Sequence, residues 1–553
     1  MKLNILAGII LVAHITFGLP VHDRVSLAGN FGEPRPNHFH GGIDIKTDGK
    51  EGKPVFSIGD GFVSQVTIGV GGYGNAVYIH HPEGYTSVYC HLHHFMPQIA
   101  ASVRKWQYAH HSDKGTMVFP PAAIPIARGQ LIAASGNTGS SQAPHLHLEI
   151  HETRSGNLMD PLQFLGDSIQ DDVPPKAYAL MVYPFQGEGV VNGSSDKQDF
   201  SFPSHRLTNK LYAWGMVGFG ISANDFMQTS SYNRYGIFKT ELFVDHQLVF
   251  RAVAHGIPSD EQMQVNAWGD RDYYLRKGIW FMKSFALPGV TLPIFTFGAD
   301  RGIIHFNQER NYHLTYVLTD FKGNTSTYTL TVTGKKMSLG PKPELKNPLY
   351  ALCWNRANNF QLPGMQLIIG EHALAEHVEL KPKIIPRPRG WSDAYRLFPT
   401  SLPLFHYAKL ILRVRRPVAD TTKLYVVSHD GGDHYMGGTY HRGWITGKAR
   451  ELGAVYELAY DDTPPLLNPV GQSSWNSTHV IRMGIVDSQS GIASYQGYVD
   501  GQFVLFEEVR QSPWVRCDLT ATPLKRSGKW RHFTFIAIDH RNNRREFKSL
   551  IKY

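Results

Sequence analysis

Short runs of strand-forming residues, separated by turn-forming residues, occupy almost the whole chain. Segments rich in Val, Ile, Tyr, Phe and Thr alternate with clusters of Gly, Pro, Asn and Asp, and almost no segment has sustained helical periodicity. β-Branched and aromatic side chains favour pleated sheets, whereas the intervening residues favour turns. The sequence therefore predicts a mainly β fold. Because its 553 residues exceed what one hydrophobic core supports, we expect several domains.

Three segments recur, in the same order, in two parts of the chain. They are "DDVPP" (171–175) and "DDTPP" (461–465), "FVDHQLVF" (243–250) and "YVDGQFVLF" (498–506), and "HLTYVLTDFKGN" (313–324) and "HFTFIAIDHRNN" (532–543). Each copy ends in an alternating strand and an Asp-to-Asn turn, a pattern typical of immunoglobulin-like β-sandwiches. The repeat predicts two such domains, of which the first carries insertions.

The chain is predicted to divide into five parts. A linker, "MSLGPKPELKNP", follows the first repeat copy and opens a further β-rich region. The parts are a signal peptide (1–18), an N-terminal antiparallel β-sheet domain (19–168), an immunoglobulin-like domain with insertions (169–336), a β-rich domain (337–460) and a second immunoglobulin-like domain (461–553).

The first residues, "MKLNILAGIILVAHITFG", have the pattern of a secretory signal. One lysine precedes an apolar run from Ile5 to Val12, and Thr16 and Gly18 have the small-residue spacing that a signal peptidase accepts. The run is far shorter than the roughly 20 residues of a membrane span, and no later uncharged segment reaches that length. No cysteine follows the signal to carry a lipid anchor. We expect an exported protein without a transmembrane span, located in the periplasm or outside the cell.

Cysteine content and charge exclude several classes of protein. Cys90, Cys353 and Cys517 are too few and too far apart for a disulfide scaffold or a cysteine-rich metal site. The net charge of +9 is modest for this length, and no basic run is dense enough for nucleic-acid binding.

The segment "SQAPHLHLEIHE" (141–152) alternates polar and apolar residues. In a strand, residues two apart project to the same side, so His145, His147 and Glu149 share one face. The leucines and isoleucine between them share the other face, which is expected to be core. A strand that carries two imidazoles on its polar face is a candidate part of a metal site.

Upstream, "NHFHGGIDI" places His40 and Asp44 four residues apart, close enough to lie on one side of a strand or turn. With one histidine of the HxH pair they form a set of two nitrogens and one oxygen, which suits zinc. Three protein ligands leave the fourth position open to water, as in catalytic zinc sites. The residues alone do not decide whether His145 or His147 is the third ligand.

Two further motifs are interpreted structurally. His429 and Asp433 in "SHDGGDHY" repeat the HxxxD spacing, but no HxH strand is near them, so a hydrogen-bonded loop is the better interpretation. "GVGGYG" contains GxGxxG, yet it lies between two predicted strands and opens no helix. This context excludes a dinucleotide site and predicts a glycine-rich turn.

Together, "HFHGGIDI", "YCHL", "GQLIAASGNTGSS" and "PHLHLEI" closely resemble, in order and spacing, the lysostaphin-type, LytM-like zinc metalloendopeptidases that cut peptide bridges of bacterial peptidoglycan. The resemblance covers residues 31–164. It implies one Zn²⁺ held by His40, Asp44 and His147, with His145 and His91 as catalytic histidines. In such a site a zinc-activated water attacks the amide carbonyl.

The neighbours of these residues have plainer expected roles. Glu149 is expected either to orient a histidine or to be a solvated rim residue. Asn137 and Thr138 either line the cleft or form a turn. We expect Cys90 in the core, and His38, His93 and His94 at the surface.

The leading hypothesis is therefore an exported zinc endopeptidase that hydrolyses peptide cross-links of peptidoglycan, with β domains that hold an envelope protein partner or the wall. Another polypeptide substrate is open to the same chemistry. One alternative is a catalytically silent module of the same fold that binds the wall or regulates an amidase. Another is an adhesion or scaffold protein in which the β domains carry the function.

Overall fold

The computed structural model describes residues 16–22, 25–165, 169–227, 233–509 and 512–553. The protein is mainly β, as predicted, and the longest of its described helices, α1 (Pro97–His110), lies in the N-terminal domain. Residues 1–15, most of the predicted signal peptide, lie outside the described residues. None of the described helices has the length and apolar composition needed to cross a membrane.

The N-terminal domain is built on one antiparallel sheet whose spatial order differs from its sequence order. Its central strand, β13 (His145–Glu152), pairs with β4 (Ile43–Lys46) on one side and β8 (Tyr85–Cys90) on the other. The sheet order is β1–β4–β13–β8–β7–β6–β10, with the further strands β1 (Leu27–Gly29), β6 (Gly61–Val70), β7 (Gly74–His80) and β10 (Gly115–Val118). A second sheet contains β5 (Pro54–Phe56), β12 (Leu131–Ala134) and β9 (His94–Phe95).

The alternation of β13 divides its side chains between core and site, as predicted. Leu146, Leu148 and Ile150 are fully buried in the main hydrophobic cluster of the domain. The opposite face carries His145, His147 and Glu149. A hairpin at "PEG" (82–84) joins β7 and β8.

Helix α1 packs on the N-terminal domain through one face. Its buried residues, Ile99, Val103 and Gln107, are four apart and therefore lie on one face. The helix ends at His111, which has a left-handed backbone with φ 49°. The following chain forms β10 and the short β11 (Pro125–Ile126), both paired with β6.

Most of the remaining strands form three β domains within the predicted ranges, whose boundaries stay predictions. The second domain contains a ten-stranded sheet around one core. Its two longest strands are β15 (Lys176–Val191) and β17 (Leu211–Asn224). The others are β16 (Gln198–Ser201), β18 (Lys239–Val244), β19 (Gln247–Val253), β21 (Met282–Lys283), β22 (Phe295–Phe297), β23 (Ile304–Phe306), β24 (Asn311–Thr319) and β25 (Thr325–Gly334).

The third domain contains two five-stranded sheets. They comprise β27 (Asn358–Leu362), β28 (Met365–Ile369), β32 (Pro403–Arg413), β36 (Trp444–Glu451) and β35 (Thr439–His441), and β30 (Lys383–Ile385), β31 (Ala394–Arg396), β37 (Val455–Tyr460), β33 (Leu424–His429) and β34 (Asp433–Tyr435).

The C-terminal domain contains two four-stranded sheets around one core. They comprise β38 (Leu466–Pro469), β39 (Val480–Val486), β43 (Trp514–Asp518) and β42 (Glu507–Glu508), and β41 (Gln502–Val504), β40 (Ile492–Val499), β44 (Trp530–Asp539) and β45 (Arg544–Lys552).

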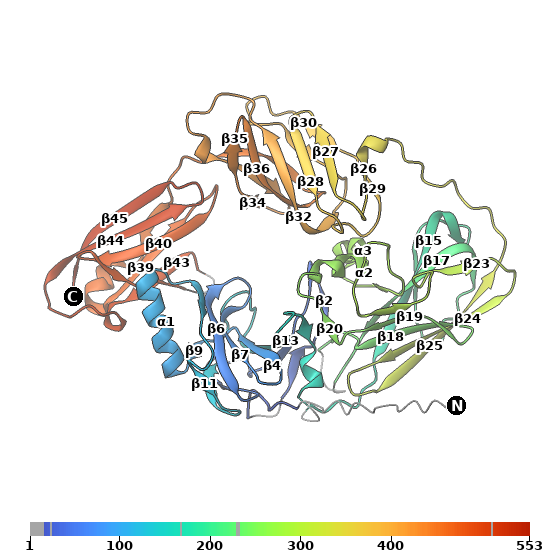
Figure 1. Ribbon diagram of the computed structural model, residues 1–553, viewed down its shortest axis with the longest axis horizontal. Helices are drawn as coiled ribbons and strands as arrows, with labels where there is room; N and C mark the ends of the chain where they lie inside the picture. The colour runs from blue at the N-terminus through green and yellow to red at the C-terminus, as the bar shows by residue number, and fades with distance from the viewer. Residues whose placement is uncertain (1–15, 23–24, 166–168, 228–232, 510–511) are drawn as a thin grey trace, which may run out of the picture.

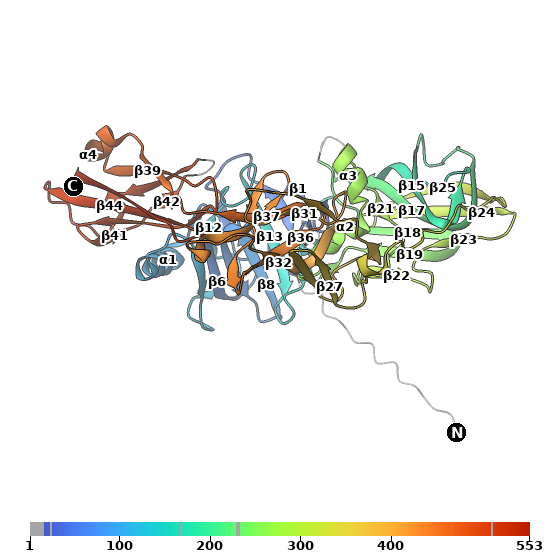
Figure 2. The ribbon, with the colours of Figure 1, turned by 90° about the horizontal axis from the view of Figure 1, so that it is seen from above.

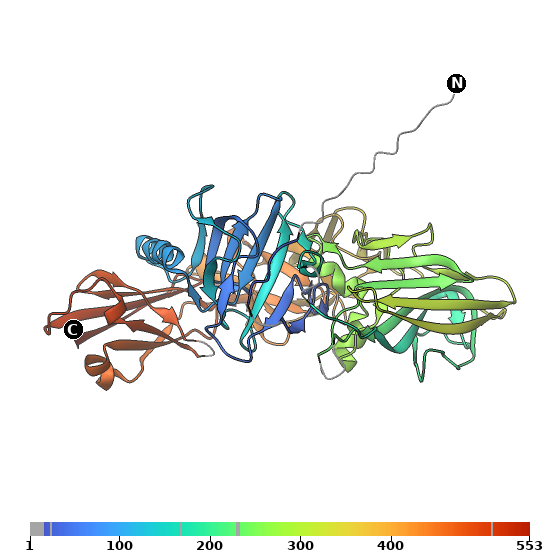
Figure 3. The ribbon, with the colours of Figure 1, turned by 90° about the horizontal axis from the view of Figure 1, so that it is seen from below.

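The four domains form a closed ring, in which the C-terminal domain returns to helix α1 of the first (Figure 1). Figures 2 and 3 show that the ring is flat, with the second and C-terminal domains at its two ends. Hydrogen bonds at the four junctions include Phe39 N to Gln262 Oε1 (3.0 Å), Gly289 N to Ala375 O (2.7 Å), Lys423 Nζ to Arg541 O (2.8 Å) and Tyr495 Oη to Asp113 Oδ2 (2.5 Å).

Residues near the predicted signal cleavage point pack on the N-terminal domain. The amide of Phe17 donates to the carbonyl of Phe164 at 2.8 Å, and that of Gly18 donates to the carbonyl of Ile58 at 2.7 Å. The ring of Phe17 is only 4% exposed and lies within the main cluster of the domain. Residues at the end of the predicted signal therefore contribute to this core.

We expect Phe503→Ala to open the ring at the contact with α1. The Phe503 ring is 6% exposed, stacks on His111 with centroids 4.7 Å apart and meets the edge of Tyr108 at 5.4 Å. Truncation removes about 2 kcal/mol of apolar burial from this junction. Small-angle scattering should show a larger radius of gyration for the variant, while Leu550→Ala, at a 52% exposed position, leaves the radius unchanged. An unchanged radius for Phe503→Ala would show that other contacts close the ring.

Candidate metal centre

Two neighbouring strands place the predicted ligands side by side. In the pairing of β4 with β13, Asp44 is directly opposite His147 and Lys46 is opposite His145. His40 follows the short strand β3 (His38–Phe39) and precedes two glycines. A Cβ at Gly42 would lie 2.1 Å from the carbonyl oxygen of Leu148, so glycine is required for the two segments to approach.

Three ligand atoms converge between these segments. His40 Nε2 lies 3.1 Å from Asp44 Oδ1 and 3.1 Å from His147 Nδ1, and His147 Nδ1 lies 2.8 Å from Asp44 Oδ1. All three residues are buried, at 2%, 8% and 6% exposure for His40, Asp44 and His147. Two imidazole nitrogens and a carboxylate oxygen at these separations fit the zinc ligand set predicted from the sequence.

The outer nitrogen of each histidine has a hydrogen-bond acceptor that fixes its orientation. His40 Nδ1 donates to the carbonyl of Asn30 at 2.6 Å, and His147 Nε2 donates to Glu149 Oε1 at 2.9 Å. These partners leave His40 Nε2 and His147 Nδ1 as the nitrogens directed at the cluster. Of the two roles expected for Glu149, the structure shows the one that orients a histidine.

Glu149 is itself held in place by two further side chains. Tyr73, from the glycine-rich "GVGGYG" turn, donates its hydroxyl to Glu149 Oε2 at 2.7 Å, and His151 Nε2 lies 2.6 Å from the same oxygen. Glu149 is 2% exposed, and although burial favours its neutral form, hydrogen bonds from His147 and His151 lower its pKa. It is therefore a fixed anion beneath His147.

Burial and neighbouring charges act in opposite directions on the three ligands. Burial favours neutral Asp44, but the charge of His40 and hydrogen bonds from His145 and His147 outweigh it and lower the Asp44 pKa. Burial lowers the pKa of His40. Burial also opposes charge on His147, yet hydrogen bonds to Asp44 and Glu149 raise its pKa to about 9. A metal bound through His147 Nδ1 would therefore displace a proton.

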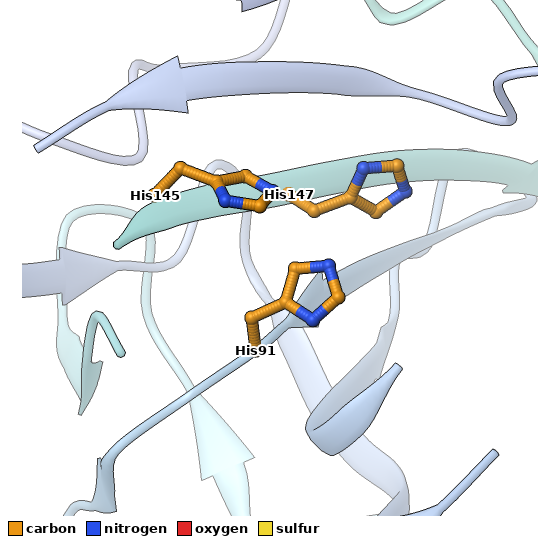
Figure 4. Close-up of side chains that lie close together, drawn as sticks. All are labelled: His91, His145 and His147. Carbon is orange, nitrogen blue, oxygen red and sulfur yellow. The ribbon is translucent and has the colours of Figure 1, made fainter. Parts of the chain in front are cut away.

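The two predicted catalytic histidines lie beside this cluster. Figure 4 shows the imidazole of His91 directed at those of His145 and His147, with ring centroids 4.8 and 5.7 Å away. His91 has a left-handed backbone with φ 60° and donates Nδ1 to the carbonyl of Thr138 at 2.8 Å. His145 donates Nδ1 to the carbonyl of Ala143 at 2.8 Å, and its Nε2 lies 3.3 Å from Asp44 Oδ1.

These contacts leave the Nε2 atom of His91 available for chemistry. Burial and the nearby His147 and His145 lower the pKa of His91 to about 4, so its imidazole is neutral at neutral pH. The loop residue Thr138 holds His91 through its carbonyl and donates its hydroxyl to the carbonyl of Leu92 at 3.2 Å. Asn137 is 2% exposed, and neither its side-chain oxygen nor its nitrogen has a partner in the described structure.

Sequence reasoning missed a basic neighbour of the cluster. Arg35, at the end of the short strand β2 (Pro34–Arg35), places Nη2 3.1 Å from Asp44 Oδ2. Glu33 lies beside Arg35, and burial raises the pKa of Glu33 to about 7. No spacing motif marks either residue, because the β2–β3 hairpin brings them to the site.

The three histidines predicted at the surface, and Cys90 predicted in the core, lie where the sequence indicated. His38, His93 and His94 are exposed. Cys90 is fully buried in a small cluster with Ala76 and Val88, and burial raises the pKa of its thiol. 

Outside this domain, His429 and Asp433 form a hydrogen-bonded pair rather than part of a ligand cluster. His429 Nδ1 lies 2.6 Å from Asp433, and its Nε2 lies 3.0 Å from Glu457 in the third domain.

We expect Glu149→Gln to weaken metal binding while the fold is retained. Glutamine keeps the size of the side chain but removes the negative charge beneath His147. Loss of such an outer partner typically lowers metal affinity by about 10- to 100-fold. Competition with a zinc-binding dye measures the change, with Glu152→Gln at the exposed end of β13 as the control. Equal affinities for the two variants would show that Glu149 does not support the site.

Comparison with known proteins identifies two regions of the chain. Residues 38–161 match Peptidase family M23, and residues 349–461 match the Zu5-like domain family. The N-terminal domain thus belongs to Peptidase family M23, in agreement with the predicted LytM-like resemblance. For the second range the sequence had predicted only a β-rich domain.

Individual relatives align with the same N-terminal region. An uncharacterized metalloprotease of Haemophilus influenzae is 33% identical over 123 residues, which make up 22% of this chain and 20% of that protein. A lipoprotein NlpD/LppB homologue of Pseudomonas aeruginosa is 35% identical over 124 residues, or 22% and 32% of the two chains. The alignment therefore spans well under half of either relative.

Among solved structures, the catalytic domain of lysostaphin from Staphylococcus simulans aligns at 24% identity and a TM-score of 0.20. The alignment covers 26% of this chain and 92% of that one.

Proposed function

We propose that this protein is an exported zinc-dependent endopeptidase that hydrolyses peptide cross-links of bacterial peptidoglycan. The observation that carries the proposal is the convergence of His40, Asp44 and His147, each histidine held by an outer acceptor, within a sequence region of Peptidase family M23. The similarity to a metalloprotease supports the reaction class. The similarity to a lipoprotein supports a location in the cell envelope.

In this proposal the three ligands hold one zinc ion through His40 Nε2, Asp44 Oδ1 and His147 Nδ1. When bound, zinc supplies Lewis acidity that polarises a peptide carbonyl and activates water. His91 and His145 are the histidines next to the ligands that remain available to the substrate. Neutral His91 is suited to accept a proton or to donate a hydrogen bond to the carbonyl oxygen as negative charge develops there.

The other β domains are proposed to position the peptidase rather than to catalyse. Because the C-terminal domain contacts α1, the positions of the three other domains are coupled to that of the N-terminal domain. We propose that they hold an envelope protein or the wall itself. A purely adhesive or scaffolding role would be indicated if residues 170–553 alone reproduced the phenotype of the whole chain.

Zinc content and sacculus digestion, measured side by side, test the proposal. The whole protein should hold about one zinc per chain and release peptide fragments from purified sacculi. His145→Ala should keep the zinc and lose about 100-fold or more in rate, the range expected for a proton-transfer group. Stoichiometric zinc without release from sacculi or other polypeptides would overturn the proposal and favour a binding or amidase-regulating module.

A further inference from the structure

A cluster of buried acidic residues lies outside the candidate zinc site. Asp171 precedes β15, Asp225 directly follows β17 and Asp320 directly follows β24, so three separate segments contribute one carboxylate each. One oxygen from each residue lies within 4.8 Å of those of the other two. The residues are 5%, 1% and 1% exposed in this order. Three carboxyl groups are thus gathered where little water reaches them.

The hydrogen bonds of these carboxylates are incomplete. Asp320 Oδ1 accepts from the amides of Lys322 and Asn324, at 2.8 and 2.9 Å, and its Oδ2 accepts from the Asn324 side chain at 2.7 Å. Asp171 Oδ1 accepts from the Val173 amide at 3.1 Å. In contrast, Asp171 Oδ2 and Asp225 Oδ1 are buried without a hydrogen-bond partner in the described structure.

An unpartnered buried carboxylate oxygen carries a large desolvation cost unless a proton or a cation compensates it. Burial, with the charges of the neighbouring aspartates, raises the pKa of Asp225 to about 8 and that of Asp171 to about 6. Lys322 acts in the opposite direction on Asp171. Asp171 and Asp225 thus each keep one buried oxygen that has no hydrogen-bond donor among the described residues.

The C-terminal copy of the repeat contains a corresponding cluster with more hydrogen-bond donors, in which Asp487 Oδ1 accepts from the amides of Gln489 and Gly491 at 3.0 and 2.7 Å. Asp461 precedes β38, Asp487 directly follows β39 and Asp539 is the last residue of β44, and their oxygens also lie within 4.8 Å of one another. There, however, the hydroxyl of Ser490 donates to Asp461 Oδ2 at 2.5 Å, so the oxygen equivalent to the unpartnered one of Asp171 is satisfied. The C-terminal cluster therefore provides a natural comparison for the cluster of Asp171, Asp225 and Asp320.

We propose that Asp171, Asp225 and Asp320 form a calcium-binding site at the junction between the N-terminal and second domains. The donor set is entirely oxygen and negatively charged, which selects a hard cation rather than zinc. Calcium accepts irregular carboxylate arrangements, whereas magnesium requires a nearly ideal octahedron. Water and nearby carbonyl oxygens complete the coordination.

The surroundings of the cluster indicate what the cation does. The segment after Asp225 carries Met227 and Tyr235, both buried in the core of the N-terminal domain. The Tyr235 hydroxyl donates to the carbonyl of Leu27 in β1 at 2.9 Å. Phe321, next to Asp320, packs against the same core. A cation that joins the three aspartates thus fixes the segments that attach the second domain to the peptidase domain.

Calcium binding to the whole protein, stripped of metal and reloaded with one equivalent of zinc, tests this proposal. Titration calorimetry should find one calcium ion per chain, and millimolar calcium should raise the midpoint of thermal unfolding by about 5 °C or more. Asp225→Asn should abolish both effects, whereas Asp487→Asn in the C-terminal cluster should keep them. Because Asp225→Asn removes a buried carboxyl group whose charged form is destabilised, its unfolding midpoint without calcium should equal or exceed that of the natural protein.

Four results would overturn the proposal. They are a midpoint that does not respond to calcium, full calcium binding by Asp225→Asn, loss of binding in Asp487→Asn, and an equal shift with magnesium at the same concentration. The zinc content of every sample is measured in parallel and stays at one per chain. The outcome is thereby separated from that of the proposed peptidase function, which neither requires nor predicts the calcium site.

Discussion

His147→Ala is expected to lose bound zinc and to release nothing from sacculi above background. His147 contributes the nitrogen nearest to Asp44, at 2.8 Å, and it is the one residue shared by the ligand cluster and the group formed with His91 and His145. Alanine leaves two ligands, and metal affinity should fall by about 100-fold or more. This loss is larger than the one expected when only the hydrogen-bond partner of a ligand is removed. Metal analysis after gel filtration and a dye-release assay on sacculi measure the two losses.

The HxxxD pair of the third domain supplies the matched control for this prediction. His429 has the same spacing to Asp433 that His40 has to Asp44. Each of its ring nitrogens is, however, engaged in a hydrogen bond, one with Asp433 and one with Glu457. His429→Ala should leave zinc content and activity unchanged. If His429→Ala lost zinc and His147→Ala kept it, the metal centre would lie in the third domain.

The β class and the polar face of β13 could be predicted because both follow from local alternation. Strand period alone places His145 and His147 on one face, and the buried Leu146 and Leu148 on the opposite face confirm that pattern. The choice between the two histidines could not be derived this way. Our proposal of His147 rests on contacts that strand period does not encode, because Glu149 accepts from His147 Nε2 at 2.9 Å and leaves Nδ1 directed at Asp44.

Contacts between distant segments account for what the sequence did not predict. Arg35 reaches Asp44 through a two-strand hairpin with no ligand spacing of its own. The repeat revealed Asp171 and Asp320 with their counterparts, but Asp225 lies outside the matched segments and joins them only in the folded domain. Closure of the ring likewise depends on the contact of Phe503 with α1. Neither the sequence around Phe503 nor that of α1 indicates this contact.

Gly42→Ala is expected to damage the metal centre without touching a ligand. A Cβ at this position would lie 2.1 Å from the carbonyl oxygen and 2.8 Å from the carbonyl carbon of Leu148, both backbone atoms of β13. Strands β4 and β13 must separate to admit it, and Asp44 moves away from His147 with them. We expect a loss of about 1–3 kcal/mol in the free energy of unfolding, and about 100-fold in activity from a displacement near 1 Å.

Gly72→Ala is the control that separates this effect from a general intolerance of alanine. Its Cβ would meet only the Ser140 hydroxyl at 3.7 Å, an ordinary contact, in the same domain. Denaturant unfolding and zinc affinity of this variant should match those of the natural protein within about 0.5 kcal/mol. If Gly42→Ala behaved the same way, strand β13 would yield locally at Leu148, and the ligand positions would not depend on the close approach of the two strands. Loss of zinc affinity in Gly42→Ala alone would instead show that the backbone contact at Gly42 sets the distance between Asp44 and His147.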